Sequence, residues 1–391
     1  MRLKYVVSEV DDRRRLDGSL PLLTVSIHRG VQPAPSEQAG GDSEYKVCRA
    51  GQLVLNRMRA FQGALGVAPV DGLASPDYAV LEVSAEHSPD FVAYLLRSPW
   101  GVAAMAARIR GIGGVENGNV RTPRINVQDL GEIECSMPNA HDQQKIADFL
   151  DCECARIDEL QAELRSVAVA AEEGAREALR GLIFDGQVPL APIKFYARTG
   201  TGHTPSRTHP EFWIEKDRVV PWFTLADVNQ IRDGRRVVVT DTAERITHVG
   251  IANSSAVLHP AGTVVLSRTA SVGFSAIMGV DMAVSQDFMT WTCGPHLEPR
   301  YLLWTLRAMQ PELRGLMYGS THKTIYMPDL EAIRIPLPGL GRQHEIVLEA
   351  ERNAASTVPL IDEIAAADAG LAEYRAARIT EAVTGKVQVS A

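Results

Sequence analysis

The sequence Asp142-Gln143-Gln144-Lys145-Ile146-Ala147-Asp148-Phe149-Leu150 begins a run that continues to Phe184 without a proline. Apolar residues recur in this run every three or four positions, which is the period of an amphipathic helix, and charged residues fill the positions between them. The spacing predicts one helix of about 43 residues, roughly 64 Å long, with a heptad-like seam along one face. The predicted seam residues are Ile146, Leu150, Ile157, Leu160, Leu164, Val167, Ala171 and Ala178.

A second helix of the same kind is predicted near the end of the chain. Proline costs about 3 kcal/mol inside a helix but is accepted in the first turn. Because Pro359 precedes the apolar positions, we expect the long distal helix to begin near Thr357 or Pro359, after a short preceding helix. The two helices can pack as an antiparallel pair, or each can pack on its own domain. The apolar positions of the second helix are Ile361, Ile364, Leu371, Tyr374, Ile379 and Val383.

The two helical segments belong to a repeat that runs through the whole chain. Residues 50–57 (Ala-Gly-Gln-Leu-Val-Leu-Asn-Arg) match residues 261–268 (Ala-Gly-Thr-Val-Val-Leu-Ser-Arg). Ile157-Asp158-Glu159 matches Ile361-Asp362-Glu363, which predicts four extra residues in the second copy. Each half therefore consists of a mixed α/β globular unit followed by an acidic helix. Further matches, at an offset of 200, pair Asp129-Leu130, Pro138, Gln143 and Ile146 with Asp329-Leu330, Pro338, Gln343 and Ile346.

Composition and charge leave room for a nucleic-acid partner. The net charge is −8, but residues 141–190 carry −6 and residues 341–391 carry −3, so the rest is near neutral and can present a basic face. Arginine outnumbers lysine by 33 to 7, which suits phosphate and guanine recognition and is equally explained by a GC-rich genome. Five cysteines do not make a disulfide framework, and the sequence lacks a signal-peptide core and any long apolar run. We expect a cytoplasmic protein without a membrane span.

The motifs of the enzymes that act on DNA are incomplete. An adenine methyltransferase needs a Pro-Pro-aromatic loop, and Ser75-Pro76-Asp77-Tyr78 lacks its second proline. Gly385-Lys386 lacks the rest of a phosphate-binding loop, and Glu44-Tyr45-Lys46 lacks a separated acid for a nuclease metal. Cys152 and Cys154 lie two positions apart on a predicted helix and point to different faces, so they form no zinc pair. We expect no catalytic residue, no metal and no cofactor.

With its repeat of a globular unit followed by an acidic helix, the sequence resembles the specificity (S) subunits of type I restriction-modification systems. The resemblance is carried by Gln143–Leu150 followed by Arg156-Ile157-Asp158-Glu159-Leu160, and by the tail Thr380–Val387. In the second globular unit, Gly202-His203-Thr204-Pro205-Ser206-Arg207 and Val220-Pro221-Trp222 resemble the opening of a target recognition domain. The first unit departs from this pattern, because Ser26–Val31 stands where the Thr-Pro-Ser loop is expected.

The resemblance implies two mixed α/β target recognition domains separated by two long helices that pack as an antiparallel coiled coil, with an internal pseudo-twofold repeat. The implied domains are a first recognition domain (1–140), a central helical region (141–188), a second recognition domain (189–340) and a distal helical region (341–391).

The resemblance also implies a non-catalytic role. Each recognition domain reads one half of a bipartite target in double-stranded DNA, and the helices set the spacer and dock two methyltransferase (modification) subunits. Restriction subunits, which are ATP-dependent translocases and nucleases, join this complex. The alternatives are an S-like DNA-binding scaffold of another defence assembly and a degenerate DNA methyltransferase.

Candidate DNA-contacting residues lie in loops next to predicted strands, because Arg and Asn read base edges while Lys and Arg hold phosphates. A solvated surface side chain is the alternative at each position. The run Arg232, Arg235 and Arg236 is either a phosphate grip or a hairpin tip. The candidates are Arg57, Arg59, Asn119, Arg121, Arg124, Thr204, Ser206, Arg207, Arg268, Thr321, His322 and Lys323, and the residues expected at the helix seam and docking surface are Leu150, Ile157, Leu160, Leu164, Ile361, Ile364 and Leu371.

Overall fold

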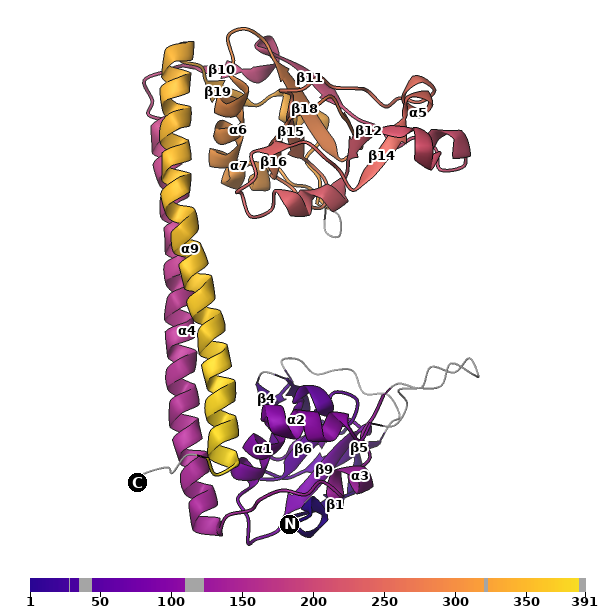
Figure 1. Cartoon of the computed structure of the whole chain (residues 1–391), viewed down its shortest axis with the longest axis vertical. Helices are drawn as coiled ribbons and strands as arrows, with labels where there is room; N and C mark the ends of the chain where they lie inside the picture. The colour runs from indigo at the N-terminus through magenta and orange to yellow at the C-terminus, as the bar shows by residue number, and fades with distance from the viewer. Residues whose placement is uncertain (28, 35–43, 110–122, 320–322, 387–391) are drawn as a thin grey trace. The chain divides into compact units, whose positions relative to one another are not determined.

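The computed structural model describes residues 1–27, 29–34, 44–109, 123–319 and 323–386. The chain forms two compact units: unit 1 is Met1–Leu164 with Ala366–Ala391, and unit 2 is Arg165–Ala365. Each unit holds a globular domain of mixed α/β type and part of two long helices, α4 (Ala140–Ile183) and α9 (Leu340–Val383) (Figure 1). The expected fold class is confirmed.

The described residues of the globular domain of unit 1 form two sheets and three short α-helices. One sheet is antiparallel and has the strand order β1-β9-β6-β7; the other has the order β2-β5-β8-β3-β4, in which only β3 and β8 are parallel. Its elements are η1 (Leu3–Tyr5), β1 (Val7–Val10), β2 (Arg13–Arg15), β3 (Leu22–Ser26), β4 (Gly30–Pro33), β5 (Glu44–Cys48), β6 (Leu53–Asn56), η2 (Ala60–Gln62), β7 (Leu65–Val67), β8 (Gly72–Ala74), β9 (Tyr78–Val83), α1 (Pro89–Arg97), α2 (Pro99–Ala106) and α3 (Val127–Gly131).

The globular domain of unit 2 is built on a five-stranded sheet with the order β11-β18-β15-β16-β13. A second sheet, β14-β12-β17, carries the outer part of the domain, and β10 pairs with β19. Its elements are β10 (Leu190–Pro192), η3 (Ile193–Phe195), β11 (Ala197–Thr201), η4 (Pro210–Phe212), η5 (Glu215–Asp217), β12 (Arg218–Phe223), η6 (Leu225–Gln230), β13 (Val238–Val239), β14 (Glu244–Thr247), α5 (His248–Ala252), β15 (Val264–Ser267), β16 (Ser275–Met278), β17 (Ala283–Val284), β18 (Phe288–Cys293), α6 (Pro299–Ala308), α7 (Gln310–Gly315), α8 (Met327–Glu331) and β19 (Arg334–Pro336).

The repeated sequence around residues 50–57 and 261–268 forms the same structure twice. Gly51 and Gly262 end a turn with φ of +88° and +84°, values that glycine adopts without strain. Asp71 accepts the N–H of Ala50 at 2.8 Å, and Asp281 accepts the N–H of Ala261 at 2.9 Å. The strands that follow, β6 and β15, are buried in the centre of their sheets because their side chains are apolar on both faces.

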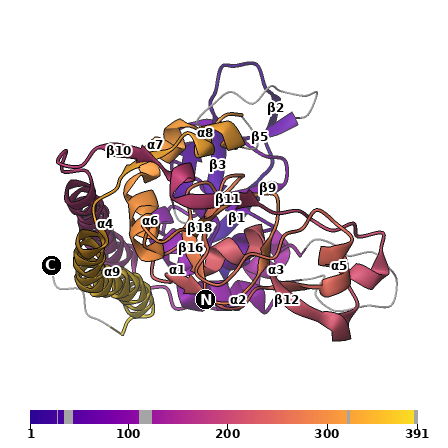
Figure 2. The same ribbon diagram turned by 90° about the horizontal axis from the view of Figure 1, so that it is seen from above.

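The two long helices lie side by side and run antiparallel (Figures 1 and 2). In unit 1, Gln161 Nε2 donates to the carbonyl oxygen of Asp368 at 3.1 Å, and Arg375 pairs with Asp158 at 2.5 Å. In unit 2, Leu179 of α4 and Ala350 of α9 belong to one buried cluster. The alternative, in which each helix packs only on its own domain, does not hold.

The expected start of the distal helix near Thr357 or Pro359 is wrong, because α9 is continuous from Leu340 to Val383 and contains Pro359. Pro359 and Ala355, whose carbonyl loses its helical partner, are both exposed, so water can satisfy that oxygen.

The four extra residues that the sequence match predicts in the second copy are also absent from the structural alignment of the two helices. The two helices have 44 residues each and start and end at an offset of 200, which pairs Ile361 with Gln161 rather than with Ile157.

The predicted seam needs one shift in register. Leu160 is 41% exposed and Val167 is 51% exposed, whereas Gln161 is buried and Ala168 is half-buried. A seam that averages 3.5 residues alternates steps of four and three, which leads from Ile157 to Gln161 and not to Leu160. Among the other expected positions, Leu150, Ile157 and Ile364 are buried, and Leu164, Ile361 and Leu371 are half-buried.

Candidate nucleic-acid interface

In unit 2, three loops meet at one end of the central sheet. The loop after β11 starts at Gly202, where an added Cβ would lie 1.7 Å from the carbonyl oxygen of Val284, so only glycine permits this close approach. Thr204 Oγ1 donates to Gln286 Oε1 at 2.7 Å, which joins the loop to the turn between β17 and β18. Arg268, at the end of β15, donates its Nε to the carbonyl oxygen of Gln286 at 3.0 Å. The predicted residues Thr204 and Arg268 are thus brought together through Gln286.

Arg268 holds loops together and is not a free side chain. Its Nη1 also donates to the carbonyl oxygen of Ile325 at 3.2 Å, and its backbone N–H donates to Asp287 O at 2.9 Å. These two bonds to carbonyl oxygens from different loops fix the orientation of the guanidinium and join the loops. We therefore assign Arg268 a positioning role.

The loop after Arg268 contains Ala270, which has φ of +57° and is the one non-glycine with positive φ among the described residues. Such a backbone conformation is strained for alanine and needs support from neighbouring structure. Its N–H donates to the carbonyl oxygen of Lys323 at 2.9 Å, which places Lys323 beside this loop with an exposed side chain. Thr321 and His322 lie outside the described residues.

Arg207 is held on an aromatic surface at the edge of the same region. Its guanidinium carbon lies 3.8 Å from the ring centroid of Trp213 and 5.6 Å from that of Trp222, and its Nη2 donates to Glu244 at 2.6 Å. The side chain remains 56% exposed. A planar guanidinium that is oriented by stacking and still reaches solvent is suited to the acceptor edge of guanine. Ser206, its neighbour, shares a hydrogen bond of 2.8 Å with Thr208.

A polar hollow of about 680 Å³ lies next to this loop, and sequence reasoning missed most of its residues. His209 stacks on Phe212 with ring centroids 5.0 Å apart, and its Nδ1 lies 2.9 Å from Glu211. A backbone N–H and the His209 ring together lower the pKa of Glu211. The other side of the hollow is formed by α5 and the residues after it, about 40 positions away in sequence, so no local motif marks the site. The hollow is lined by His203, Ser206, His209, Glu211, Phe212, Val249, Asn253, Ser254 and Ser255.

In unit 1 the candidates separate into paired and unpaired side chains. Arg57 forms an ion pair with Glu9, which also pairs at 2.9 Å with Lys46, a lysine only 3% exposed. Arg57 is therefore part of the structure of this domain, like Arg268 in unit 2. Arg59 and Arg124 are exposed and have no ion pair among the described residues. Asn119 and Arg121 lie outside the described residues.

The two units position these loops with the same backbone bond. Ile125 N–H donates to the carbonyl oxygen of Arg57 at 3.0 Å, and Ile325 N–H donates to that of Arg268 at 2.9 Å. In both units the segment before a short helix, α3 or α8, is thereby joined to the residue that follows a central strand. The candidate surfaces of the two units are equivalent in the repeat.

Comparison with known proteins supports the resemblance that the sequence motifs indicate. Residues 201–348 match the model of the type I restriction modification DNA specificity domain. The chain is 25% identical over 167 residues to the type I restriction enzyme MjaIX specificity subunit of Methanocaldococcus jannaschii, covering 41% of this chain and 37% of that protein. It is 24% identical over 190 residues to the EcoprrI specificity subunit of Escherichia coli, covering 45% of each. The chain thus spans less than half the length of these curated relatives.

Solved structures share the fold over nearly the whole chain. A chain from a structure of a type I restriction-modification system has a TM-score of 0.74 and 18% identity, covering 99% of this chain and 97% of that one. The HsdS subunit from Thermoanaerobacter tengcongensis has a TM-score of 0.52 and 18% identity, covering 99% and 96%.

The resemblance to type I specificity subunits is thus supported by a matching domain over residues 201–348, by the curated relatives and by the shared fold. Its curated relatives are named specificity subunits of type I restriction enzymes. Among the described residues, His, Cys, Asp and Glu form no group of three placed to hold a metal ion. Nor does any helix in the described ranges have the length and apolar character needed to cross a membrane.

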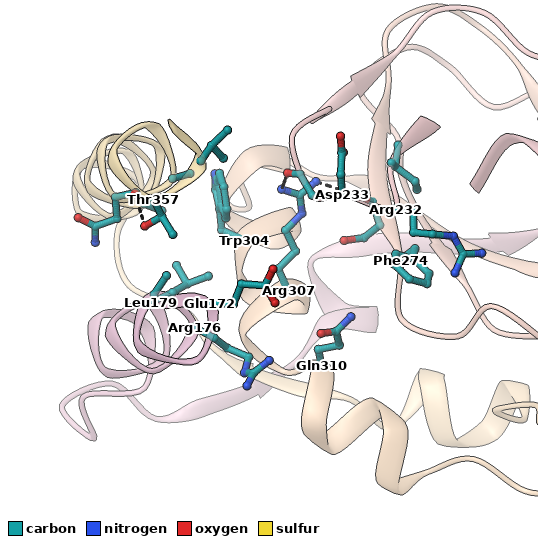
Figure 3. Close-up of a pocket in the computed structure, with 18 of the residues that line it drawn as sticks. Glu172, Arg176, Leu179, Arg232, Asp233, Phe274, Trp304, Arg307, Gln310 and Thr357 are labelled. Carbon is teal, nitrogen blue, oxygen red and sulfur yellow. Dashed lines mark hydrogen bonds between the residues drawn. The ribbon is translucent and has the colours of Figure 1, made fainter. Parts of the chain in front are cut away.

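The globular domain of unit 2 meets the helix pair around a cavity of about 340 Å³ (Figure 3). Glu172, Arg176 and Leu179 of α4 face Trp304 and Arg307 of α6 across it. Arg307 donates to the carbonyl oxygens of Gly234 (2.7 Å), Arg236 (3.1 Å) and Ser275 (3.4 Å), and burial lowers its pKa to about 10. Arg307 therefore holds the turn before β13 against its own helix, α6.

The arginine run in that turn is a structural contact with the helix pair. Arg235 donates from both terminal nitrogens to Asp362 of α9, with Nη1 at 3.0 Å from Oδ2, and it also lies 3.5 Å from Asp233. Arg232 donates to Ser271 Oγ at 3.1 Å, and Arg236 donates to Gln230 at 2.5 Å. The run thus lies in a turn between η6 and β13 and not at a hairpin tip, and Arg235 is paired with a carboxylate within the chain.

Two buried glutamines explain the motif that carries the family resemblance. Gln143 and Gln343 are both fully buried at the start of α4 and α9. Gln143 Oε1 accepts the N–H of Ser88 at 2.9 Å, and its Nε2 donates to Pro138 O at 2.7 Å. Gln343 makes the equivalent bonds, to Glu298 N–H at 2.9 Å and to Pro338 O at 2.8 Å. Each glutamine joins the start of a long helix, α4 or α9, to the residue that precedes α1 or α6 in the same unit.

Replacing Gln143 with leucine should destabilise unit 1. The substitution leaves the Ser88 N–H and the Pro138 carbonyl buried without their partner, which costs about 1–3 kcal/mol. The adjacent Gln144 is exposed, so Gln144→Leu is a matched control with little expected effect. Urea unfolding followed by circular dichroism measures both. Equal midpoints for the two variants would contradict the structural role of Gln143.

Proposed function

We infer that this chain is the DNA-reading subunit of a type I restriction-modification complex. Each recognition domain reads one half of a bipartite target in double-stranded DNA. The observation that carries the proposal is the repeated loop geometry, in which Arg57 with Ile125 and Arg268 with Ile325 position equivalent surfaces in the two units. A protein with two equivalent reading surfaces is suited to a target in two parts.

The residues proposed to contact DNA are the exposed, positively charged or polar side chains of these loops. In unit 2 they are Arg207 and Lys323, with Thr204 and Ser206 beside them. In unit 1 they are Arg59 and Arg124, with Asn119 and Arg121 in the same sequence segment. Arg57 and Arg268 hold the loops in place. Arginine on Trp213 supplies base reading, and the lysine supplies a phosphate contact.

The helix pair is proposed to dock two methyltransferase subunits and to set the spacer of the target. Leu160 and Leu360 occupy equivalent positions on α4 and α9 and are 41% and 43% exposed. Exposed leucines at matching positions of two helices provide equal apolar contacts for two copies of one partner. Restriction subunits, the ATP-dependent translocases and nucleases, complete the complex. The assembly acts in the cytoplasm, where the chromosomal DNA lies.

The isolated chain should not transfer methyl groups to DNA, because it is proposed to read DNA for a separate catalytic subunit. Together with its methyltransferase subunit it should methylate a bipartite sequence. Incubation with DNA and S-adenosylmethionine, followed by methylation-sensitive sequencing, measures both states. Methyl transfer by the isolated chain would contradict the proposal, and so would a complex that methylates DNA without sequence preference.

Arg207→Ala should weaken binding to the specific target by about 5- to 150-fold, the range expected for loss of one bidentate base contact. Arg207→Lys should recover little, because lysine keeps the charge but not the planar fork. Arg300, an exposed arginine paired with Glu351 on α9, provides the control variant Arg300→Ala. Fluorescence anisotropy on specific and random duplexes separates the outcomes. An equal loss on both duplexes would make Arg207 a phosphate contact instead of a base reader.

A further inference from the structure

Two short turns at equivalent places in the repeat each expose a large aromatic ring. In unit 1, η1 buries Leu3 fully and leaves Tyr5 68% exposed. In unit 2, η3 buries Ile193 and leaves Phe195 73% exposed. Such an exposed phenylalanine adds almost nothing to the core of its own domain. We call η1 and η3 the aromatic turns.

The aromatic turns have the same anchoring and the same flanking residue. Leu3 N–H donates to Ile133 O at 3.0 Å, and Ile193 N–H donates to Ile333 O at 3.1 Å. The ammonium of Lys4 lies 5.5 Å from the Tyr5 ring centroid, and that of Lys194 lies 5.8 Å from the Phe195 ring centroid. A single exposed apolar residue is ordinary on a protein surface. The same ring, lysine and anchor in both copies indicate a shared binding role.

The position of the turns separates them from the proposed DNA surface. Phe195 precedes β11, and the loop that contains Arg207 follows β11. A strand of this length spans roughly 17 Å, so the two features lie at opposite ends of the sheet. In unit 1, Tyr5 precedes β1, and the Glu9–Arg57 pair lies toward the far end of that strand. The binding role of the aromatic turns is thus directed to a partner other than the DNA.

The surroundings indicate what that partner presents. A hollow of about 340 Å³ beside Phe195 is lined by Lys194, Arg198 and His296 among others, so its rim is basic. In unit 1, Lys4 is 2.9 Å from Glu132, which offsets part of its charge. The two turns therefore differ in their net charge, but both present an exposed aromatic ring. An aromatic anchor surrounded by polar groups is the usual arrangement at the centre of a protein–protein contact.

We propose that the aromatic turns are anchor points for two copies of the methyltransferase subunit, one on each unit. The matching surface on that subunit is an apolar pocket with carboxylates at its edge. Because the two turns are equivalent, one surface of one partner fits both, which accounts for two copies. This inference rests on the proposed function and adds a second contact to the helix pair.

The test measures the stoichiometry and affinity of the complex formed by the full chain with its methyltransferase subunit. Native mass spectrometry and sedimentation velocity should give two methyltransferase subunits per wild-type chain. Phe195→Ala and Tyr5→Ala should each weaken one of the two binding events by at least about tenfold, as expected for an interface anchor, and the double variant should weaken both. Phe195→Tyr should restore binding to within about threefold, because it keeps the ring.

Controls separate this inference from the proposed function. Tyr326 is 56% exposed and lies at the opposite end of the domain, next to Ile325, so Tyr326→Ala should leave the stoichiometry unchanged. Thermal unfolding of each variant alone should match wild type, since neither ring is buried. Two bound subunits with unchanged affinity in the double variant would overturn the inference while leaving the function intact. Unchanged assembly with weaker DNA binding would overturn it in favour of a DNA contact. A wild-type chain that binds no methyltransferase subunit would instead count against the function itself.

Discussion

Replacing residues 1–140 with the same segment of another specificity subunit should change one half of the DNA target completely and leave the other half unchanged. The globular domain of each unit has its own buried core, because one cluster lies within unit 1 and another within unit 2. The reading loops of one unit are positioned by bonds inside that unit, such as Ile125 N–H to Arg57 O. Methylome sequencing of a strain that carries the exchanged subunit measures both halves of the target at once.

The segment that replaces residues 1–140 must pack against the long helices of this chain. The core of the first recognition domain includes Ile146 and Leu150 of α4 and Ala382 and Val383 of α9, which the exchange leaves in place. The donor domain must therefore present a matching apolar face to these four side chains. The reciprocal exchange of residues 189–340 serves as the control and should change the other half. A change in both halves after either exchange would contradict independent reading.

A matched insertion of four residues in each long helix should lengthen the spacer of the target by about two base pairs. Four residues add roughly 6 Å to a helix and complete about one turn, so the attached domains rotate little. Base pairs rise by about 3.4 Å, which converts this length to nearly two of them. Both half-site sequences should stay the same, because no reading loop is altered.

The insertion sites follow from the antiparallel register. Leu179 of α4 and Ala350 of α9 belong to one buried cluster, and Gly174 lies five residues before the first as Ala355 lies five residues after the second. Both positions are exposed, and nothing lies within 4 Å of an added Cβ at Gly174. A four-residue insertion at Gly18, in a turn of unit 1 with nothing within 4 Å, is the control and should leave the spacer as it is. Methylation of the original spacer by the helix variant would show that the helices do not set the distance.

The pattern of the sequence was sufficient for the architecture because that pattern is local and repeated. The 3–4 spacing after Gln143 is set by the helical period, and it predicted a long amphipathic helix without any knowledge of its partner. The matches between residues 50–57 and 261–268 predicted that one fold occurs twice, and Gly51 and Gly262 have nearly equal φ values. Repeated sequence forms repeated structure because the same local interactions are made in each copy.

The sequence did not reveal which of two neighbouring positions on a long helix faces the other helix. Leu160 and Gln161 both follow Ile157 at helical spacing, and hydrophobicity alone favours the leucine. Gln161 is buried because the register of the antiparallel pair places it over the carbonyl of Asp368, which accepts its amide N–H. Pro359 was expected to begin a helix, yet α9 passes through it because the ring faces solvent and the helix is held on both sides of it.

The sequence by itself determined that this chain has two equivalent halves, two long helices and the motifs of a specificity subunit. Only the tertiary structure decided what its arginines do. Arg57, Arg235 and Arg268 have partners from distant segments, namely Glu9, Asp362 and the carbonyl of Gln286, so they stabilise the fold. Arg207 also pairs with a distant residue, Glu244, but its guanidinium stacks on Trp213 and the side chain remains 56% exposed. A guanidinium takes its role from the acceptors within its reach, and those are set by contacts between residues far apart in the chain.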